Sequence, residues 1–520
     1  MKRLFWLLVC IVTAACVQAV GKVDICIYGG TSSGVMAAYT ARKAGKKVLL
    51  VEPTDRIGGL TTGGLGATDI GNPYIMKGYA YDFYKRIGKY YGTDAMHFAF
   101  EPKAALAIYQ QYVDEAGVEI LYNHRLKSVQ KQGNVIRSLV VEDSRKPDVK
   151  TDLTIEAKEF IDCSYEGDLM AKAGVSYAVG REDNTQYGET WNGAFYSLHH
   201  QFPDYVDPYV VKGDPKSGLL YGILSEEPPI PGKGDKHIQA YNFRITLTDD
   251  PENLIPITRP ENYDPSKYEL MVRLKERSPF TELGLSDVFI WSEMPNRKTD
   301  INNRGGFSTD MIGENWDYPE GDYETRARIF QKHLDYTKGL LYFMGHDERI
   351  AEPVRKEMLR WGYPKDEFLT SGHFTPQLYI RESRRMIGRY VMTQANCENR
   401  VKVDDAVGWA AYTMDSHNCG RYVINGMVKN EGNVETAIKE PYQVSYKAIT
   451  PQEDECANLL VPVCLSASHI AYGSIRMEPV FMVLGQSAAL AACQAIDRHQ
   501  GIVQRVDAAE VYRLMDNSVK

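Results

Sequence analysis

Val23-Asp24-Ile25-Cys26-Ile27-Tyr28-Gly29-Gly30-Thr31-Ser32-Ser33-Gly34 is the stretch that decides the fold. An apolar run of strand type breaks at glycines and then continues into residues that suit a helix. In this order the turn brings a phosphate close to the unpaired N–H groups at the start of the helix. Glu52 ends the next apolar run, and an acid there accepts hydrogen bonds from the hydroxyls of an adenosine ribose. The stretch therefore predicts an α/β, Rossmann-like dinucleotide-binding domain.

The turn departs from the G-x-G-x-x-G fingerprint at one position. Thr31 stands where the second glycine is usual, although its hydroxyl can donate to a phosphate. Gly29 permits the tight turn and Gly34 lets the helix lie close to the sheet. We predict Gly29, Thr31, Ser33 and Gly34 as cofactor-binding residues, with Glu52 on the ribose.

A second glycine cluster distinguishes between dinucleotides. Ile57-Gly58-Gly59 follows Glu52 by five residues and leads into a glycine-rich segment that ends at Gly66. A nicotinamide domain has no need of this cluster, whereas in an FAD domain the chain often folds back here over the ribityl and diphosphate. We therefore predict FAD, bound by Gly58 and Gly59. Arg56 is predicted to meet a phosphate, and a solvated surface charge is the alternative.

Later segments return to the same sheet. A strand over 151–162 leads into Asp162 and the pair Gly167-Asp168, and a strand over 458–465 precedes a long helix that begins near Glu478. We predict Asp162, Gly167, Asp168, Arg476 and Glu478 as further cofactor-binding residues, because the fold places these junctions near the cofactor. A positive group such as Arg476 would stabilise the reduced flavin.

These segments divide the chain into four parts. Residues 1–19 are the expected signal peptide, and residues 20–184 and 371–520 build the FAD-binding domain from both ends of the chain. Residues 185–370 are rich in Tyr, Pro, Asp and Asn, and we expect them to form an inserted α+β substrate or cap domain.

The first residues are typical of an export signal. Met1-Lys2-Arg3 is followed by a short apolar run and then by small residues, with a cleavage site after Ala19. The expected location is therefore secreted or periplasmic, and a lipoprotein anchored at Cys16 is the alternative. The apolar run is too short to span a bilayer comfortably and no later segment qualifies, so we expect no integral membrane span.

Composition limits the classes of ligand and partner that the protein is expected to bind. The net charge of −8 and the lack of a long basic run argue against nucleic acid. The 34 tyrosines suit polar organic ligands such as sugars, or reflect ordinary core and surface use. We expect no metal site, because His199-His200 has no further ligands at metal spacing and no C-x-x-C occurs.

Several blocks together carry a family resemblance. They are residues 28–34, 57–59, 165–168, 298–303, 381–386, 414–417 and 466–479. In these blocks the chain resembles the FAD-dependent oxidoreductase family, whose bacterial members are often secreted and sometimes labelled xanthan lyase-like. The resemblance implies FAD, a redox role and a fold similar to glutathione-reductase-like flavoproteins. It implies no particular substrate.

The candidate catalytic residues are two histidines and two arginines. His417 and His469 are candidate bases, since a histidine can take a hydroxyl proton while flavin N5 takes a hydride. Arg381 and Arg385 share a face at helical spacing and suit a substrate carboxylate or a phosphate. The alternatives are hydrogen-bonded structural histidines and a helix that is salt-bridged through Glu382.

The expected function is a secreted FAD-dependent oxidoreductase. It would transfer hydride from an alcohol-bearing small molecule, such as a sugar or glycoside, to flavin N5. The alternatives are a polysaccharide lyase that acts by β-elimination, and a non-catalytic glycan-binding protein with a vestigial flavin site.

Overall fold

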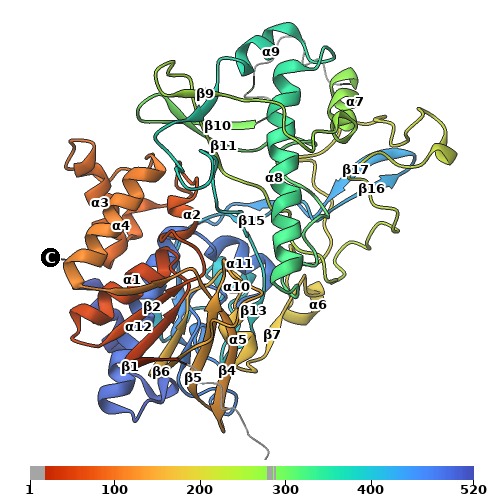
Figure 1. Ribbon diagram of the computed structural model, residues 1–520. Helices are drawn as coiled ribbons and strands as arrows, with labels where there is room; N and C mark the ends of the chain where they lie inside the picture. The colour runs from red at the N-terminus through yellow and green to blue at the C-terminus, as the bar shows by residue number, and fades with distance from the viewer. Residues whose placement is uncertain (1–17, 278–284, 286–288, 520) are drawn as a thin grey trace, which may run out of the picture.

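The lower part of the molecule is built on one sheet (Figure 1). The computed structural model describes residues 18–277, 285 and 289–519, so residues 1–17 of the expected signal peptide lie outside the described residues, and its last two residues, Gln18 and Ala19, begin the first strand. The strands are β1 (Gln18–Tyr28), β2 (Val48–Glu52), β3 (Glu119–Tyr122), β4 (His124–Gln132), β5 (Val135–Asp143), β6 (Leu153–Asp162) and β20 (Leu459–Leu460). Their order is β3-β2-β1-β6-β5-β4, with β20 also on β6. The Rossmann-like arrangement is therefore confirmed.

Strand β6 joins the two ends of the chain. One edge pairs in parallel with β1 along almost its whole length. The other edge pairs first with β5, through residues 153–156, and then with β20, through Phe160 and Ile161. The C-terminal segment thus completes the sheet beside the carboxyl ends of β1 and β6, which is where α/β sheets bind ligands.

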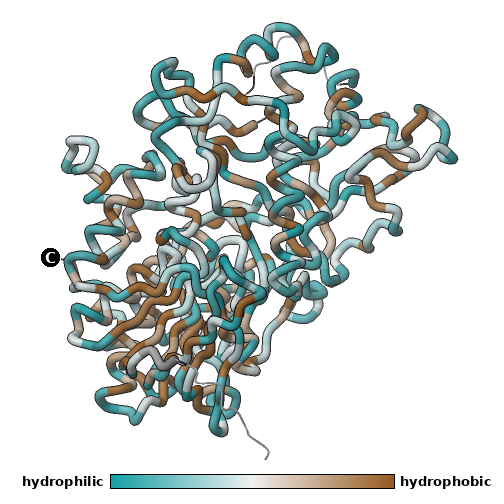
Figure 2. Tube along the Cα trace, in the orientation of Figure 1, coloured by the Kyte–Doolittle hydropathy of each residue, from teal (hydrophilic) through white to brown (hydrophobic). Residues whose placement is uncertain are grey.

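The central strands are apolar on both faces. Every residue of β2 is buried, and so is β1 from Ile25 to Tyr28. One face of these strands packs against helices and the other packs against apolar side chains of β4 and β5, so both faces are buried. Figure 2 shows the same concentration of apolar residues in the lower part of the molecule.

Helices pack on one face of the sheet and against one another. They are α1 (Ser32–Lys43), α3 (Gly78–Tyr90), α4 (Pro102–Ala116), α12 (Glu478–Arg498) and α13 (Ala508–Asp516). Helix α12 packs along α1, and Gly485 permits this contact, because a Cβ there would stand 2.3 Å from the carbonyl oxygen of Ser33. The small residues of α12 therefore bring it against the first turn of α1.

Helix α12 is also the one helix among the described residues that is long and apolar enough to cross a membrane. However, 89% of its most apolar stretch is buried inside the protein. Its apolar character is that of a core helix.

The upper part of the molecule is α+β (green in Figure 1). An antiparallel sheet has the order β10-β11-β8-β12-β9. Its strands are β8 (Ile245–Thr248), β9 (Leu254–Pro256), β10 (Phe289–Met294), β11 (Lys298–Asn303) and β12 (Gly362–Pro364), and its helices are α7 (Glu269–Arg277), α8 (Tyr323–His346) and α9 (Glu352–Met358). All of them fall within residues 185–370. The exact domain boundaries stay a prediction.

The C-terminal part also contributes to this upper region. The hairpin of β16 (Gly420–Ile424) and β17 (Met427–Glu431) bonds to the inserted segment, where Val428 N donates to Val206 O at 3.0 Å. The remaining elements are short: α2 (Gly59–Thr62), α5 (Asp168–Lys172), α6 (Asn184–Tyr187), α10 (Gln394–Cys397), α11 (His469–Ile475), β7 (Tyr177–Ala178), β13 (Arg385–Met386), β14 (Ala406–Ala410), β15 (Met414–Ser416), β18 (Val434–Thr436) and β19 (Tyr442–Ser445).

Two local expectations were wrong. The segment that carries Arg381 and Arg385 is not helical: it is irregular up to β13, because its guanidinium groups reach carboxylates on separate segments. The strand expected over 458–465 has only two residues, since Val461 N turns to the carbonyl of Ile449 and Pro462 has no N–H to donate.

Candidate functional site

The glycine turn is held against the end of β6. Gly29 has φ +96°, and a Cβ there would stand 2.7 Å from the backbone nitrogen of Ser164. Thr31 caps α1: its hydroxyl accepts from Gly34 N at 3.3 Å and donates to the carbonyl of Cys163 at 2.8 Å. The residue that departs from the fingerprint therefore ties the turn to the sheet.

Glu52 lies directly behind this turn. Its carboxylate accepts from Gly30 N at 2.7 Å and from the backbone and hydroxyl of Thr54 at 2.8 and 2.6 Å. Burial raises the pKa of Glu52 to about 7, although the hydrogen bonds from Thr54 and Gly30 oppose the rise. The acid is thus brought to the glycine turn, as the motif predicts.

The second glycine cluster meets the first. Gly58 N donates to Gly30 O at 2.6 Å, and a Cβ on Gly59 would stand 2.4 Å from the hydroxyl of Tyr165. Arg56 donates through Nε to the carbonyl of Thr62 at 3.0 Å. Its Nη2 is buried without a hydrogen-bond partner among the described residues. This placement differs from a solvated surface charge.

Hydroxyl groups converge at the start of α1. Ser32, Thr61 and Tyr165 donate to the carboxylate of Glu478 at 2.5, 2.9 and 2.7 Å. Burial raises the pKa of Glu478 and these three hydroxyls oppose the rise. The carboxylate of Glu478 therefore already engages these three donors beside the start of α1.

Two further polar atoms near this turn have no partner. The hydroxyls of Ser33 and Tyr109 are buried and unpartnered within the described part of the chain. Three features fit the diphosphate of a dinucleotide. They are the glycine turn, where a Cβ would clash, the N-terminus of α1, and the unpartnered hydroxyls. Glu52 then fits the ribose of the dinucleotide.

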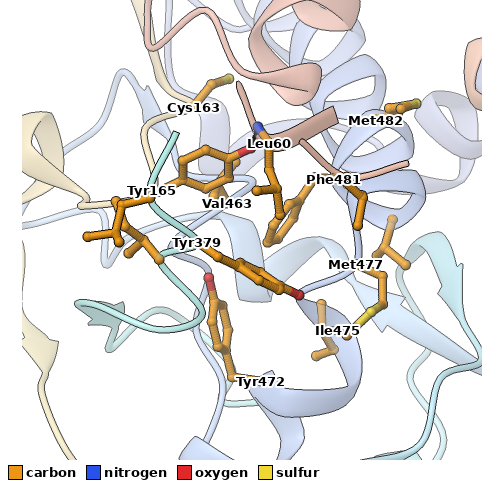
Figure 3. Packing of buried hydrophobic residues seen from close by; sticks show 14 of the residues in the cluster. Leu60, Cys163, Tyr165, Tyr379, Val463, Tyr472, Ile475, Met477, Phe481 and Met482 are labelled. Atoms are coloured by element: carbon orange, nitrogen blue, oxygen red, sulfur yellow. Dashed lines mark hydrogen bonds between the residues drawn. The ribbon is translucent and has the colours of Figure 1, made fainter. Parts of the chain in front are cut away.

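Aromatic and apolar side chains gather near the start of α12 (Figure 3). Leu60, Tyr165, Tyr379 and Phe481 face one another, and the Tyr165 and Phe481 ring centroids are 6.5 Å apart. With Arg476 and others they surround a small cavity. A flavin ring bound there requires these side chains to move apart.

A polar cluster extends from this cavity into the inserted part. His417 Nδ1 lies 2.9 Å from Asp310 Oδ2, and its Nε2 lies 3.5 Å from Asp415 Oδ2. Asp415 accepts from Arg476 Nη2 at 2.8 Å, and Arg476 Nη1 donates to the hydroxyl of Tyr379 at 2.9 Å. His417 is thus linked through one carboxylate to the cavity wall.

Both carboxylates of this cluster are held in the charged form. Burial alone would raise the pKa of Asp310, but Arg381 and His417 lower it below its ordinary value. Burial likewise opposes ionisation of Asp415, and His417 and Arg476 outweigh it, so that its pKa is also lowered. His417 therefore lies between two anionic groups.

The other predicted catalytic residues are more fully engaged by the protein. Arg385 binds Glu182 at 2.5 Å and Glu382 at 2.8 Å, in a network buried from solvent. His469 uses both ring nitrogens, with Glu382 at 2.7 Å and the hydroxyl of Ser416 at 3.0 Å. This arrangement favours a supporting position for these two residues.

Arg381 lies closer to the polar cluster. It pairs with Asp310 at 2.9 Å, and its guanidinium stands 4.7 Å from the centroid of the Tyr379 ring. Arg381 and His417 thus share one carboxylate.

The residues after β6 are engaged locally. Asp162 accepts from Ser164 and from Met170 N, and burial raises its pKa to about 6 against these hydrogen bonds. Asp168, which follows Gly167 in its left-handed turn, pairs with Arg326 at 2.7 Å and Arg384 at 2.8 Å. Their predicted contact with the cofactor stays a prediction.

Three residues of the cluster were not singled out from the sequence. Asp415 carried a signal, since it stands two positions before His417. Tyr379 stands two positions before Arg381, and its aromatic character alone does not point to a site. Asp310 carried none, because 107 positions separate it from His417.

One protein family matches nearly the whole chain. The pattern of the FAD dependent oxidoreductase family matches residues 24–515. No curated protein matches the chain.

Solved structures are similar to only part of this chain. THI4 from Thermovibrio ammonificans is 23% identical, with a TM-score of 0.25 over 31% of this chain and 66% of that one. The bacillithiol disulfide reductase Bdr from Bacillus cereus is 18% identical, with a TM-score of 0.20 over 27% and 39%. The 3-ketosteroid-Δ4-(5α)-dehydrogenase from Rhodococcus jostii is 14% identical, with a TM-score of 0.21 over 32% and 50%. This chain thus spans less than two thirds of each of these proteins.

The family match covers nearly the whole chain, and it includes both glycine clusters, the polar cluster and the start of α12. The chain therefore belongs to the FAD dependent oxidoreductase family, and it is a flavoenzyme with FAD as its cofactor.

Proposed function

We propose that this flavoenzyme oxidises an alcohol-bearing small molecule, with a sugar or glycoside as the substrate class. Bound FAD supplies a hydride acceptor at N5. The role of the protein is to orient the substrate hydroxyl and to take its proton, which we assign to His417.

The position of His417 carries the proposal. In the neutral form of the imidazole, with its proton on Nδ1 toward Asp310 at 2.9 Å, the lone pair lies on Nε2. Nε2 has the longer contact, 3.5 Å to Asp415, and the proposal requires a substrate hydroxyl to approach this edge of the ring. After proton transfer, the two carboxylates stabilise the imidazolium that forms.

Neighbouring groups support substrate binding. Arg381 Nη2 lies 3.3 Å from the side-chain oxygen of Asn302 and 3.5 Å from that of Asn303. Amides and guanidinium groups are partners that sugar hydroxyls use. Arg476 pairs with Asp415 and borders the aromatic cavity. In this proposal its positive charge would stabilise the reduced cofactor.

The test is a substrate screen on the FAD-loaded protein without oxygen. Free sugars, methyl glycosides, simple alcohols and uronate polymers are mixed with it in turn. The proposal expects the visible flavin absorption to bleach with at least one hydroxyl compound. Absorbance of an unsaturated uronate with unchanged flavin would instead support the lyase.

Export is a separate proposal, which rests on residues 1–19. We propose that the chain is cleaved after Ala19 and released to the periplasm or the medium. N-terminal sequencing of the exported protein should begin at Val20. A lipid-modified N-terminus at Cys16 would show the anchored form, and a chain retained in the cytoplasm with Met1 intact would refute export.

A further inference from the structure

A cavity of about 680 Å³ lies mainly in the inserted part, with Lys429 of the C-terminal part also in its lining, and it shares no residue with the polar cluster. This volume lies within the range of small-molecule sites, about 300–1,000 Å³. The walls include six buried apolar side chains: Phe202, Met271, Leu274, Phe307, Met344 and Ile350. They come from α7, α8, the loops at 198–204 and 304–307 and the connection between α8 and α9, so several separate elements build an apolar interior.

Cations outnumber anions at its edge. The charged lining residues are Lys275, Arg304, Lys429 and Asp204. Lys429 Nζ pairs with Asp204 at 2.8 Å, which neutralises both. The one carboxylate of the lining is therefore already engaged by Lys429.

Lys275 has a different environment. Its ammonium donates to the carbonyl of Arg349 at 2.8 Å, and it has no salt bridge with a carboxylate in the described part of the chain. Burial, and then the charge of Arg355, lower the pKa of Lys275. Nε of Arg355 is itself buried without a partner among the described residues. A partly desolvated positive field therefore lies at the edge of an apolar cavity.

We propose that this cavity binds an apolar small molecule that carries one anionic group, such as an alkyl or aryl carboxylate. The apolar body is buried among Phe202, Met344 and their neighbours. The anion meets Lys275, whose charge has no carboxylate to balance it. This site does not depend on the proposed reaction.

Calorimetry on the FAD-loaded protein tests the proposal with decanoate and 1-decanol as matched probes. We expect one decanoate per chain, bound about tenfold more tightly than decanol. Lys275→Met should remove this preference and leave decanol binding unchanged. Lys216→Met, an exposed lysine outside the cavity, should keep the preference.

Variants that fill the cavity with a larger side chain test the site independently of Lys275. Ala351→Trp should abolish binding of both probes, and Val354→Phe should weaken both if the first variant does not fold. Equal affinity for the two probes, a preference that survives Lys275→Met, or full binding in both filled variants would overturn the proposal. The flavin spectrum and flavin reduction are recorded separately, so their failure bears only on the proposed reaction.

Discussion

The carboxylate of Asp310 lies 2.9 Å from Nδ1 of His417, although 107 positions separate the two residues. Asp310 comes from the inserted part and His417 from the C-terminal part, so the pair forms only when the two pack together. In the oxidation that we propose, Asp310 orients the imidazole and His417 takes the proton.

Replacing His417 with Gln should slow flavin reduction by the substrate by about 10²–10⁴-fold, because proton removal loses its base. Asp310→Asn should cause a smaller loss, mainly in the reduction rate rather than in KM. Anaerobic stopped-flow measures both, and the exposed His346→Gln is the control. Reduction of the His417 variant at the wild-type rate would contradict this role.

Thr31 should contribute to stability through its cap. Thr31→Val removes the hydroxyl that bonds Gly34 N and Cys163 O, so the free energy of unfolding should fall by about 1–2 kcal/mol. Thr31→Ser keeps both hydrogen bonds and should stay close to the wild type. Urea unfolding compares them. If Thr31→Val is as stable as Thr31→Ser, the cap does not contribute to the free energy of unfolding.

Gly485→Ala should destabilise the protein and weaken FAD binding. Alanine is favoured over glycine inside a helix by about 1 kcal/mol, but here its Cβ would stand 2.3 Å from Ser33 O and push α12 off the first turn of α1. Gly345→Ala on α8 serves as the control, because its Cβ would come closest to the flexible end of Leu359, at 3.2 Å, and would otherwise make ordinary contacts at 3.5 Å or more. Thermal unfolding and FAD titration measure the effect. Tighter FAD binding in Gly485→Ala would show that the contact is not close.

Glu159 should make stability depend on pH. It is fully buried, its two carboxylate oxygens have no partner among the described residues, and burial raises its pKa well above the ordinary value. Its proton is retained in the folded state while the unfolded chain loses it above about pH 4.3. The stability contributed by this group is therefore complete below that pH and is lost as the pH rises.

Relative to Glu159→Gln, the wild type should lose up to about 1.4 kcal/mol of unfolding free energy per pH unit as the pH rises from 5. Urea unfolding at several pH values measures the difference, and other titrating groups cancel because both proteins share them. If the unfolding free energies of the two proteins change with pH in parallel, Glu159 ionises as easily in the folded state as in the unfolded state.

The parts of the site that neighbouring residues form were predictable. Gly29 and Gly34 show a turn with a helix start, and Glu52 lies at the end of the next strand, so the motif alone places them. The return of residues 458–465 to the same sheet also followed from apolar patterns, although the strand is shorter than expected and its pairing with β6 was not predicted. FAD as the cofactor is confirmed by the family match.

The parts that depend on distant residues were not predictable. Arg381 and Arg385 have helical spacing, yet they lie in an irregular segment because Asp310 and Glu182 bind them from other parts of the chain. His417 and His469 were equal candidates in sequence. The two differ only through packing, which gives His417 Nε2 a single contact of 3.5 Å to Asp415 and engages both nitrogens of His469 at 2.7 and 3.0 Å.

The most direct test of the central claim is single-turnover flavin reduction with a substrate that is deuterated at the carbon bearing the hydroxyl. We predict that the flavin bleaches without oxygen, that deuteration slows the bleaching, and that His417→Gln slows it further while FAD stays bound. Bleaching that is insensitive to both changes, or a flavin that no hydroxyl compound reduces although dithionite does, would contradict the account.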